Sequence, residues 1–154
     1  MEINIPQYNF KTRNNDGDIQ IFDEIRRKYV ALTPEELVRQ NLAKFLITEK
    51  KYPAPLISIE GSLDINGLNR RYDMLVFENS GNPLMIIECK APSIKISQKT
   101  FDQIAVYNIK TMVDYLLVTN GIDFYICKID FIDKTYEFLE EIPDYFSIIP
   151  NGSK

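Results

Sequence analysis

The sequence predicts a mixed α/β domain in which an antiparallel run of strands lies beside a crossover strand. Two stretches, residues 33–52 and 97–114, carry apolar residues at helical spacing. Short apolar runs of strand length lie between and after these stretches. One run, Tyr115–Thr119, is almost entirely apolar and directly follows the second helix, which is typical of a central strand buried on both faces.

Length and composition limit the class of protein. The 154 residues predict one domain, long enough to bury about two thirds of the chain surface. No apolar run approaches the ~18 residues of a membrane span, and the amino terminus does not resemble a secretion signal. Cys89 and Cys127 lie inside apolar runs and are too few for a disulfide framework. We therefore predict a cytoplasmic protein with reduced core cysteines and no membrane contact.

The chain contains no histidine. This absence excludes Ser-His and Cys-His nucleophilic systems, histidine general bases and nearly every common zinc site. Chemistry that uses hard cations bound to carboxylates remains open. The net charge of -4 argues against a protein that coats nucleic acid by charge alone, although it leaves room for a local basic groove.

The amino-terminal part predicts a β-hairpin. Residues 8–22 contain two alternating segments around the polar turn Asn14–Gly17. We expect this hairpin to pack on, or extend, the main sheet. The following residues, up to Leu32, predict only a short connecting segment.

The first helix has a well-marked start. Thr33 at the N-cap, Pro34 at the first helical position and Glu36 three residues after the cap predict a capping box. The expected buried face consists of Val38, Leu42, Phe45 and Leu46. The helix should end near Tyr52, ahead of two prolines.

Strands and a second helix follow. The expected strands are 55–63, 72–77, 84–89, 115–119, 124–129 and 134–139. The second helix, 97–114, should turn Phe101, Ala105, Ile109 and Met112 inward. The tail from Ile142 predicts no regular element.

The hairpin 70–92 contains an unusual pair of acids. A turn centred between Ser80 and Gly81 pairs residues whose numbers sum to 161, which places Asp73 opposite Glu88 and Arg71 opposite Lys90. Two carboxylates directly across a ladder repel each other. A divalent cation would offset that repulsion, and so would the Lys90 ammonium alone.

Two interpretations of this group remain open at this point. Magnesium prefers one or two carboxylates together with waters and phosphate oxygens, which Asp73 and Glu88 could complete, and Lys90 could then position a water or neutralise developing charge. In the other interpretation, the three residues form a structural ion cluster that closes one face of the sheet.

The motifs resemble a known superfamily. Asp73, fourteen intervening residues and then Glu88-Cys89-Lys90 resemble the PD-(D/E)XK pattern, with Tyr72 in place of the proline. Gln103 and Tyr107 resemble the QxxxY motif of one branch of these nucleases. Together with flanking segments between about Phe22 and Gly121, the chain looks like the nuclease domain at the amino terminus of type I restriction enzyme R subunits, in a stand-alone form.

The resemblance implies a restriction-endonuclease-like mixed β-sheet flanked by helices, with an N-terminal β-hairpin. It divides the domain into a hairpin extension (1–22), a catalytic core (33–121) and C-terminal strands with a tail (122–154). It also implies a magnesium-dependent deoxyribonuclease in which Mn²⁺ may substitute for Mg²⁺. Asp73, Glu88 and the Cys89 backbone carbonyl would be metal ligands, and Lys90 would be catalytic. Gln103 and Tyr107 would lie at the edge of the site.

Further residues have both a functional and an ordinary interpretation. Glu36 resembles the additional helix acid of such nucleases, but a capping box also explains it. Glu60 could join the acidic cluster or be a solvated strand residue. Four cations could grip DNA phosphates or be ordinary solvated charges: Arg70, Arg71, Lys95 and Lys99.

The expected partners are DNA and, because the chain has no GxxxxGK[ST] loop, a separate motor or restriction-system subunit. Cutting both strands with one site per chain would favour a homodimer or two separate events. The alternative function is a catalytically silent module that keeps the fold and binds DNA or a restriction or repair partner.

Overall fold

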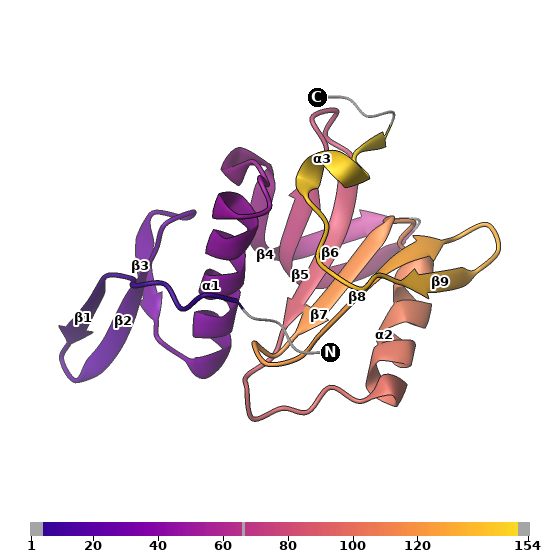
Figure 1. The fold of residues 1–154 in the computed structure, drawn as a ribbon. Coiled ribbons are helices and arrows are strands. Elements are labelled where there is room, and N and C mark those ends of the chain that lie inside the picture. The colour runs from indigo at the N-terminus through magenta and orange to yellow at the C-terminus, as the bar shows by residue number, and fades with distance from the viewer. Residues whose placement is uncertain (1–4, 66, 151–154) are drawn as a thin grey trace.

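The computed structural model describes residues 5–65 and 67–150 and shows a mixed α/β fold with two sheets and three α-helices (Figure 1). This architecture is consistent with the predicted restriction-endonuclease-like fold. Within the described ranges, no helix is long and apolar enough to cross a membrane. The elements are β1 (Thr12–Asn15), β2 (Asp18–Asp23), β3 (Lys28–Ala31), α1 (Pro34–Thr48), a 3-10 turn (Ala54–Leu56), β4 (Ile57–Ile65), β5 (Leu68–Phe77), β6 (Pro83–Cys89), α2 (Gln98–Ile109), β7 (Tyr115–Thr119), β8 (Phe124–Asp130), β9 (Thr135–Phe138) and α3 (Tyr145–Ile148).

The main sheet has six strands in the order β4-β5-β6-β7-β8-β9. Neighbouring strands are antiparallel except β6 and β7, which are parallel and joined through α2. The predicted meander beside a crossover strand is therefore confirmed. All five residues of β7 are buried, as expected for a central strand without a polar face.

Two apolar cores lie on opposite faces of this sheet. One core joins α1 and α3 to side chains such as Met74 and Ile87, and the other joins α2 to side chains such as Leu75 and Ile86. The tail expected to be irregular in fact forms α3. Tyr145 is fully buried there, and its hydroxyl donates to the Phe77 carbonyl oxygen at 3.0 Å.

The amino-terminal hairpin exists, but it does not extend the main sheet. β1, β2 and β3 form a separate three-stranded sheet beyond α1 (Figure 1). The strand predicted from Tyr8 begins only at Thr12, and the supposed connecting segment contains β3. Short polar strands of this kind give a weak pattern, because most of their side chains stay exposed.

Both long helices begin at an N-cap hydroxyl, and the Thr33 cap was predicted. The Thr33 and Ser97 hydroxyls accept backbone N–H groups of Glu36 and Thr100. The second helix, however, ends at Ile109 rather than at residue 114. Met112 then lies in a turn and is 53% exposed, so its predicted inward position is wrong. Asn108 is buried on the inner face of α2 instead, together with Phe101 and Ala105.

Candidate active site

The β5–β6 hairpin has the predicted register over its central part. Met74–Ile87, Leu75–Ile86 and Val76–Met85 pair with numbers that sum to 161, before a shift at Phe77. At the other end the ladder stops at Met74–Ile87, so the predicted backbone pairs Asp73–Glu88 and Arg71–Lys90 do not form. The Cys89 N–H instead donates to Asp73 Oδ2 at 2.7 Å, while the Lys90 N–H donates to the Thr119 carbonyl of β7 at 2.8 Å.

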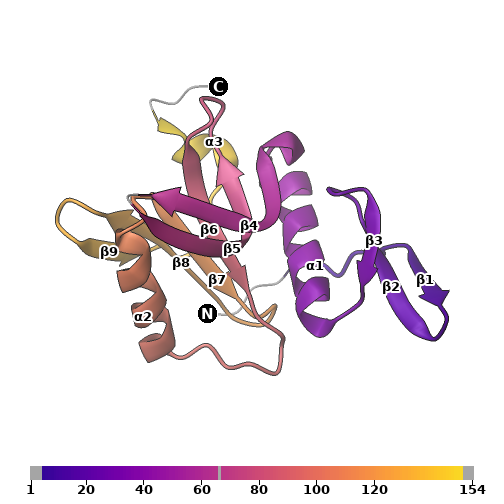
Figure 2. The ribbon, with the colours of Figure 1, turned by 180° about the vertical axis from the view of Figure 1, so that it is seen from behind.

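The ladder ends because the outer half of the β4–β5 hairpin changes direction. Ile59 and Met74 pack in the core on the α1 face, whereas Leu63 and Tyr72 pack against the core on the α2 face. Alternate residues of a regular strand would stay on one face. The change falls at Glu60, whose φ of 48° is rare for a side chain other than glycine. From there the hairpin crosses toward α2 (Figure 2).

Asp73 lies at this crossing. Burial raises the pKa of its carboxyl above the usual value, and the hydrogen bond from the Cys89 N–H opposes that rise only in part. Asp73 and Glu60 line two adjoining hollows, of about 400 Å³ toward α1 and about 360 Å³ on the other side. A partly buried carboxyl with a raised pKa, beside further acids, is typical of a functional site.

Glu88 and Lys90 line the second hollow together with Asp73, so these three predicted residues share one concavity. Glu88 forms an ion pair with Arg70 of β5. This partner was not anticipated, since the sequence offered only a metal or Lys90. Arg70 is 8% exposed, which contradicts its interpretation as an ordinary solvated charge.

Helix α2 holds Arg70 from the other side. Asn108 Oδ1 accepts a hydrogen bond from Arg70 Nε at 3.3 Å, and the guanidinium lies 5.4 Å from the centre of the Tyr107 ring. The Tyr107 hydroxyl donates to the Asn69 carbonyl at 3.2 Å. Tyr107 therefore contacts β5 and Arg70 at the edge of the site, while Gln103 is exposed.

Glu36 lines the first hollow with Asp73, yet arginines hold its carboxylate. Arg39 contacts it at 2.5 Å and Arg26 at 3.2 Å. The reciprocal half of the predicted capping box is therefore wrong, because this side chain turns to the arginines rather than to the cap. Arg26 also reaches Glu60 at 3.4 Å.

Asp23 completes this network from the N-terminal sheet. It is 1% exposed and accepts from Arg26 Nε and Arg39 Nη2, each at 2.7 Å. Sequence reasoning missed Asp23, Arg39 and Asn108. A usable signal was the spacing of Arg39 three residues after Glu36, where side chains meet on a helix.

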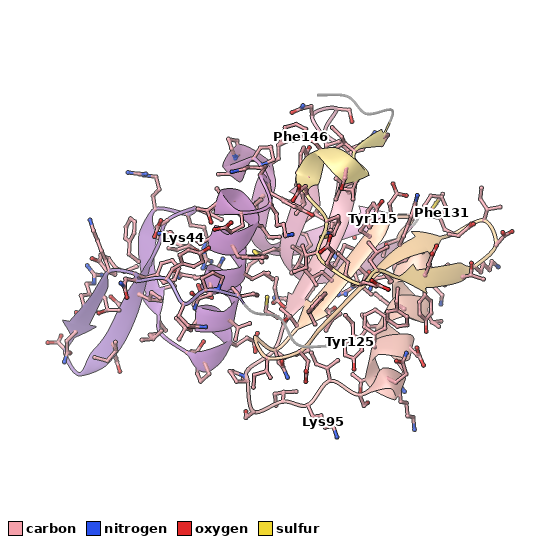
Figure 3. The ribbon with its side chains drawn as sticks, in the orientation of Figure 1. Lys44, Lys95, Tyr115, Tyr125, Phe131 and Phe146 are labelled. Atoms are coloured by element: carbon pink, nitrogen blue, oxygen red, sulfur yellow. The ribbon has the colours of Figure 1, made fainter. Side chains whose placement is uncertain are left out.

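Lys95 and Lys99 do not line either hollow. Both are exposed, and Figure 3 shows Lys95 on the loop before α2, pointing away from the sheet. Arg71 is exposed but lines the second hollow beside Lys90. Of the predicted phosphate-binding cations that remain exposed, Arg71 is thus the one at the candidate site.

Comparison with known proteins identifies the family. The family model described as "Type I restriction enzyme R protein N terminus (HSDR_N)" matches residues 34–143. The chain belongs to this family. No curated protein matches. A solved structure, the fragment of a putative HsdR subunit of a type I restriction enzyme from Vibrio vulnificus YJ016, is similar at 22% identity and a TM-score of 0.34. The alignment covers 56% of this chain and 16% of that chain.

The side chains that line the second hollow suit a hard cation. Among residues 5–65 and 67–150, no three His, Cys, Asp or Glu side chains converge as a ready metal cluster. Mg²⁺ does not require three, since it takes one or two carboxylates and fills its remaining positions with waters and substrate oxygens. Asp73 and Glu88 supply two carboxylates to one hollow, which Glu60 also lines. The oxygen-only donor set therefore fits Mg²⁺.

Replacing Asp23 with Asn should destabilise the domain by about 3 kcal/mol at neutral pH, because Arg39 would lose a buried partner. Burial opposes ionisation of Asp23, but hydrogen bonds from Arg26 and Ile25 together with the charge of Arg39 outweigh it and lower the carboxyl pKa below its usual value. This stabilisation is therefore present above about pH 4 and is lost as the pH falls through the folded-state pKa. Thermal unfolding of both proteins from pH 7 to pH 3 measures it. Their melting temperatures should converge toward acid pH; a constant gap would contradict the assignment.

Proposed function

We propose that this domain is a metal-dependent nuclease that hydrolyses DNA phosphodiester bonds in restriction or a related DNA-processing reaction. The observation that carries the proposal is the common hollow lined by Asp73, Glu88 and Lys90. These residues come from two strands whose ladder ends at this point, which leaves their side chains around an open space rather than against each other.

Asp73 and Glu88, with the Cys89 backbone carbonyl, would hold Mg²⁺ or Mn²⁺. A bound cation would supply an activated water and stabilise negative charge on the phosphodiester. Lys90 would position that water and offset the charge developing on the substrate. Arg71, Lys95 and Lys99 would bind phosphates, and Gln103 and Tyr107 would support the edge of the site. Glu36 would be a supporting acid whose carboxylate is held by Arg39.

The proposed partners are DNA and, in the cytoplasm, a separate motor or restriction-system subunit. A second copy of the domain would provide the second site needed to cut both strands. The family supports these assignments, and so does the hollow, which Arg71 and Lys90 line together with carboxylates.

A second candidate function has an observation of its own. Arg70 already neutralises Glu88, which is what a catalytically silent module would need to keep two acids side by side without a metal. Such a module would bind DNA or a restriction or repair partner without cutting.

Incubation of the purified domain with supercoiled plasmid separates the two functions. A nuclease should nick or linearise the plasmid with Mg²⁺ or Mn²⁺ and not with EDTA. The activity should disappear in an Asp73→Asn protein purified in the same way, which excludes a contaminating nuclease. Plasmid left intact with both metals, over a range of protein concentrations, would favour the silent module.

A further inference from the structure

The carboxylate of Glu88, which the proposed function assigns to the metal ion, is already paired with Arg70. Glu88 is the acid on β6 assigned to the cation, and its side chain is only 13% exposed. Arg70 supplies a full positive charge to it from the neighbouring strand. In this arrangement, a metal ion and the guanidinium would compete for the same carboxylate.

Arg70 is held in this position by several independent contacts. Its Nη1 donates to the Arg71 carbonyl, its Nε donates to Asn108, and its guanidinium lies over the Tyr107 ring. Asn108 is itself 1% exposed and anchored to the Ile104 carbonyl at 2.9 Å. Because α2 fixes these groups, Arg70 needs no rearrangement to face Glu88.

We infer that Arg70 is a built-in counter-ion that competes with the metal for Glu88 and thereby lowers the metal affinity of the free domain. The inference rests on the proposed function, since it takes Glu88 as a metal ligand. In this role Arg70 acts through Glu88, and Tyr107 and Asn108 of α2 hold its guanidinium beside the site. The Glu88 carboxylate is then charge-balanced before any cation binds, and binding must release Arg70 from Glu88.

The expected result concerns Mn²⁺ binding by the DNA-free domain, measured by calorimetry or by the electron paramagnetic resonance of free Mn²⁺. Arg70→Gln should tighten the Kd by about tenfold or more, the range expected when a close charge pair no longer has to be broken. Mn²⁺ should also raise the melting temperature of Arg70→Gln more than that of the wild type, because stabilisation grows with affinity.

Arg71→Gln is the matched control. It removes the same charge from the same hollow, one residue away, but Arg71 forms no ion pair within the part of the chain that the structure describes. It should change the Kd by about threefold at most, the effect of a screened surface charge. In Arg70→Gln/Glu88→Gln, the gain in affinity should disappear, because the released carboxylate is gone.

If Arg70→Gln does not fold, Asn108→Ala provides a second test with both charges kept: it removes the amide that accepts from Arg70 Nε and should tighten the Kd in the same direction. An unchanged Kd in the variant that folds, or an equal gain in Arg71→Gln, would overturn the inference. Plasmid cleavage by the wild type distinguishes the two failures. Cleavage with an unchanged Kd rejects the role of Arg70 alone, whereas no cleavage and no Mn²⁺ binding in any variant rejects the proposed function as well.

Discussion

Asp73→Asn should abolish metal-dependent DNA cleavage, with a loss of about 10³-fold or more in the single-turnover rate. The side chain keeps its size and an oxygen that can accept the Cys89 N–H, so the crossing of β5 should survive. What disappears is the negative charge that the proposed cation requires. The measurement is single-turnover cleavage of a labelled duplex with Mg²⁺ at saturating protein.

The same substitution should leave the metal-free protein at least as stable as the wild type. Burial raises the pKa of Asp73, which means that the fold disfavours its charged form at neutral pH. A neutral amide removes that cost. Thermal unfolding in EDTA should therefore show an equal or higher melting temperature for Asp73→Asn.

Asp64→Asn is the control for this experiment, because Asp64 is an exposed acid on the same hairpin and pairs across the ladder with Asn69. Its cleavage rate should stay close to that of the wild type. Equal rates for Asp73→Asn and the wild type would remove Asp73 from the site and, with it, the proposed mechanism.

Lys90→Ala should slow cleavage by about 10²-fold or more while leaving the DNA-free affinity for Mn²⁺ nearly unchanged. Lys90 lines the hollow with both acids, but an ammonium does not bind a cation. Its contribution should appear only when charge develops on the phosphodiester. Single-turnover rates and Mn²⁺ titrations, made on the same preparations, separate these two quantities.

Lys11→Ala serves as the control for total charge, since Lys11 is an exposed lysine near β1, outside the main sheet. It should have little effect on either quantity. A Lys90→Ala protein that cleaves like the wild type would mean that Lys90 is the structural counter-ion of the acid pair. A gain of Mn²⁺ affinity with no loss of rate at saturating metal would lead to the same conclusion, because a counter-ion competes with the metal for the acids.

The fold could be predicted where apolar spacing and turn chemistry agree. The register that pairs Val76 with Met85 follows from a polar turn between two apolar runs, and the cap at Thr33 follows from a local hydrogen bond. Met112 was assigned wrongly to the inner face of α2. The polar residue Asn108 takes a buried position on that face because its side-chain amide is hydrogen-bonded there. Its amide binds Ile104 and Arg70, and neither contact is visible in an apolar pattern.

The proximity of three of the predicted site residues could also be predicted, whereas their charge pairing could not. Asp73, Glu88 and Lys90 were found from spacing and resemblance, and the structure places them around one hollow. Their pairing depends on the change of face at Glu60, which requires an unusual backbone angle that the sequence does not specify. Once the hairpin crosses the sheet, long arginine side chains reach acids on other strands.

The strand order of the main sheet has a consequence for folding kinetics. Every strand from β4 to β9 lies beside its neighbour in the chain, so most strand pairs close only a short loop. The exception is the parallel pair β6–β7, which can form only when the long segment that contains α2 has closed into a loop. Pairing of distant strands is slow because the chain loses conformational entropy before the stabilising contacts form. The step that joins β6 and β7 should therefore limit the folding rate. Glu88 and Lys90 belong to the segment that this step fixes, so the candidate site should be completed late in folding.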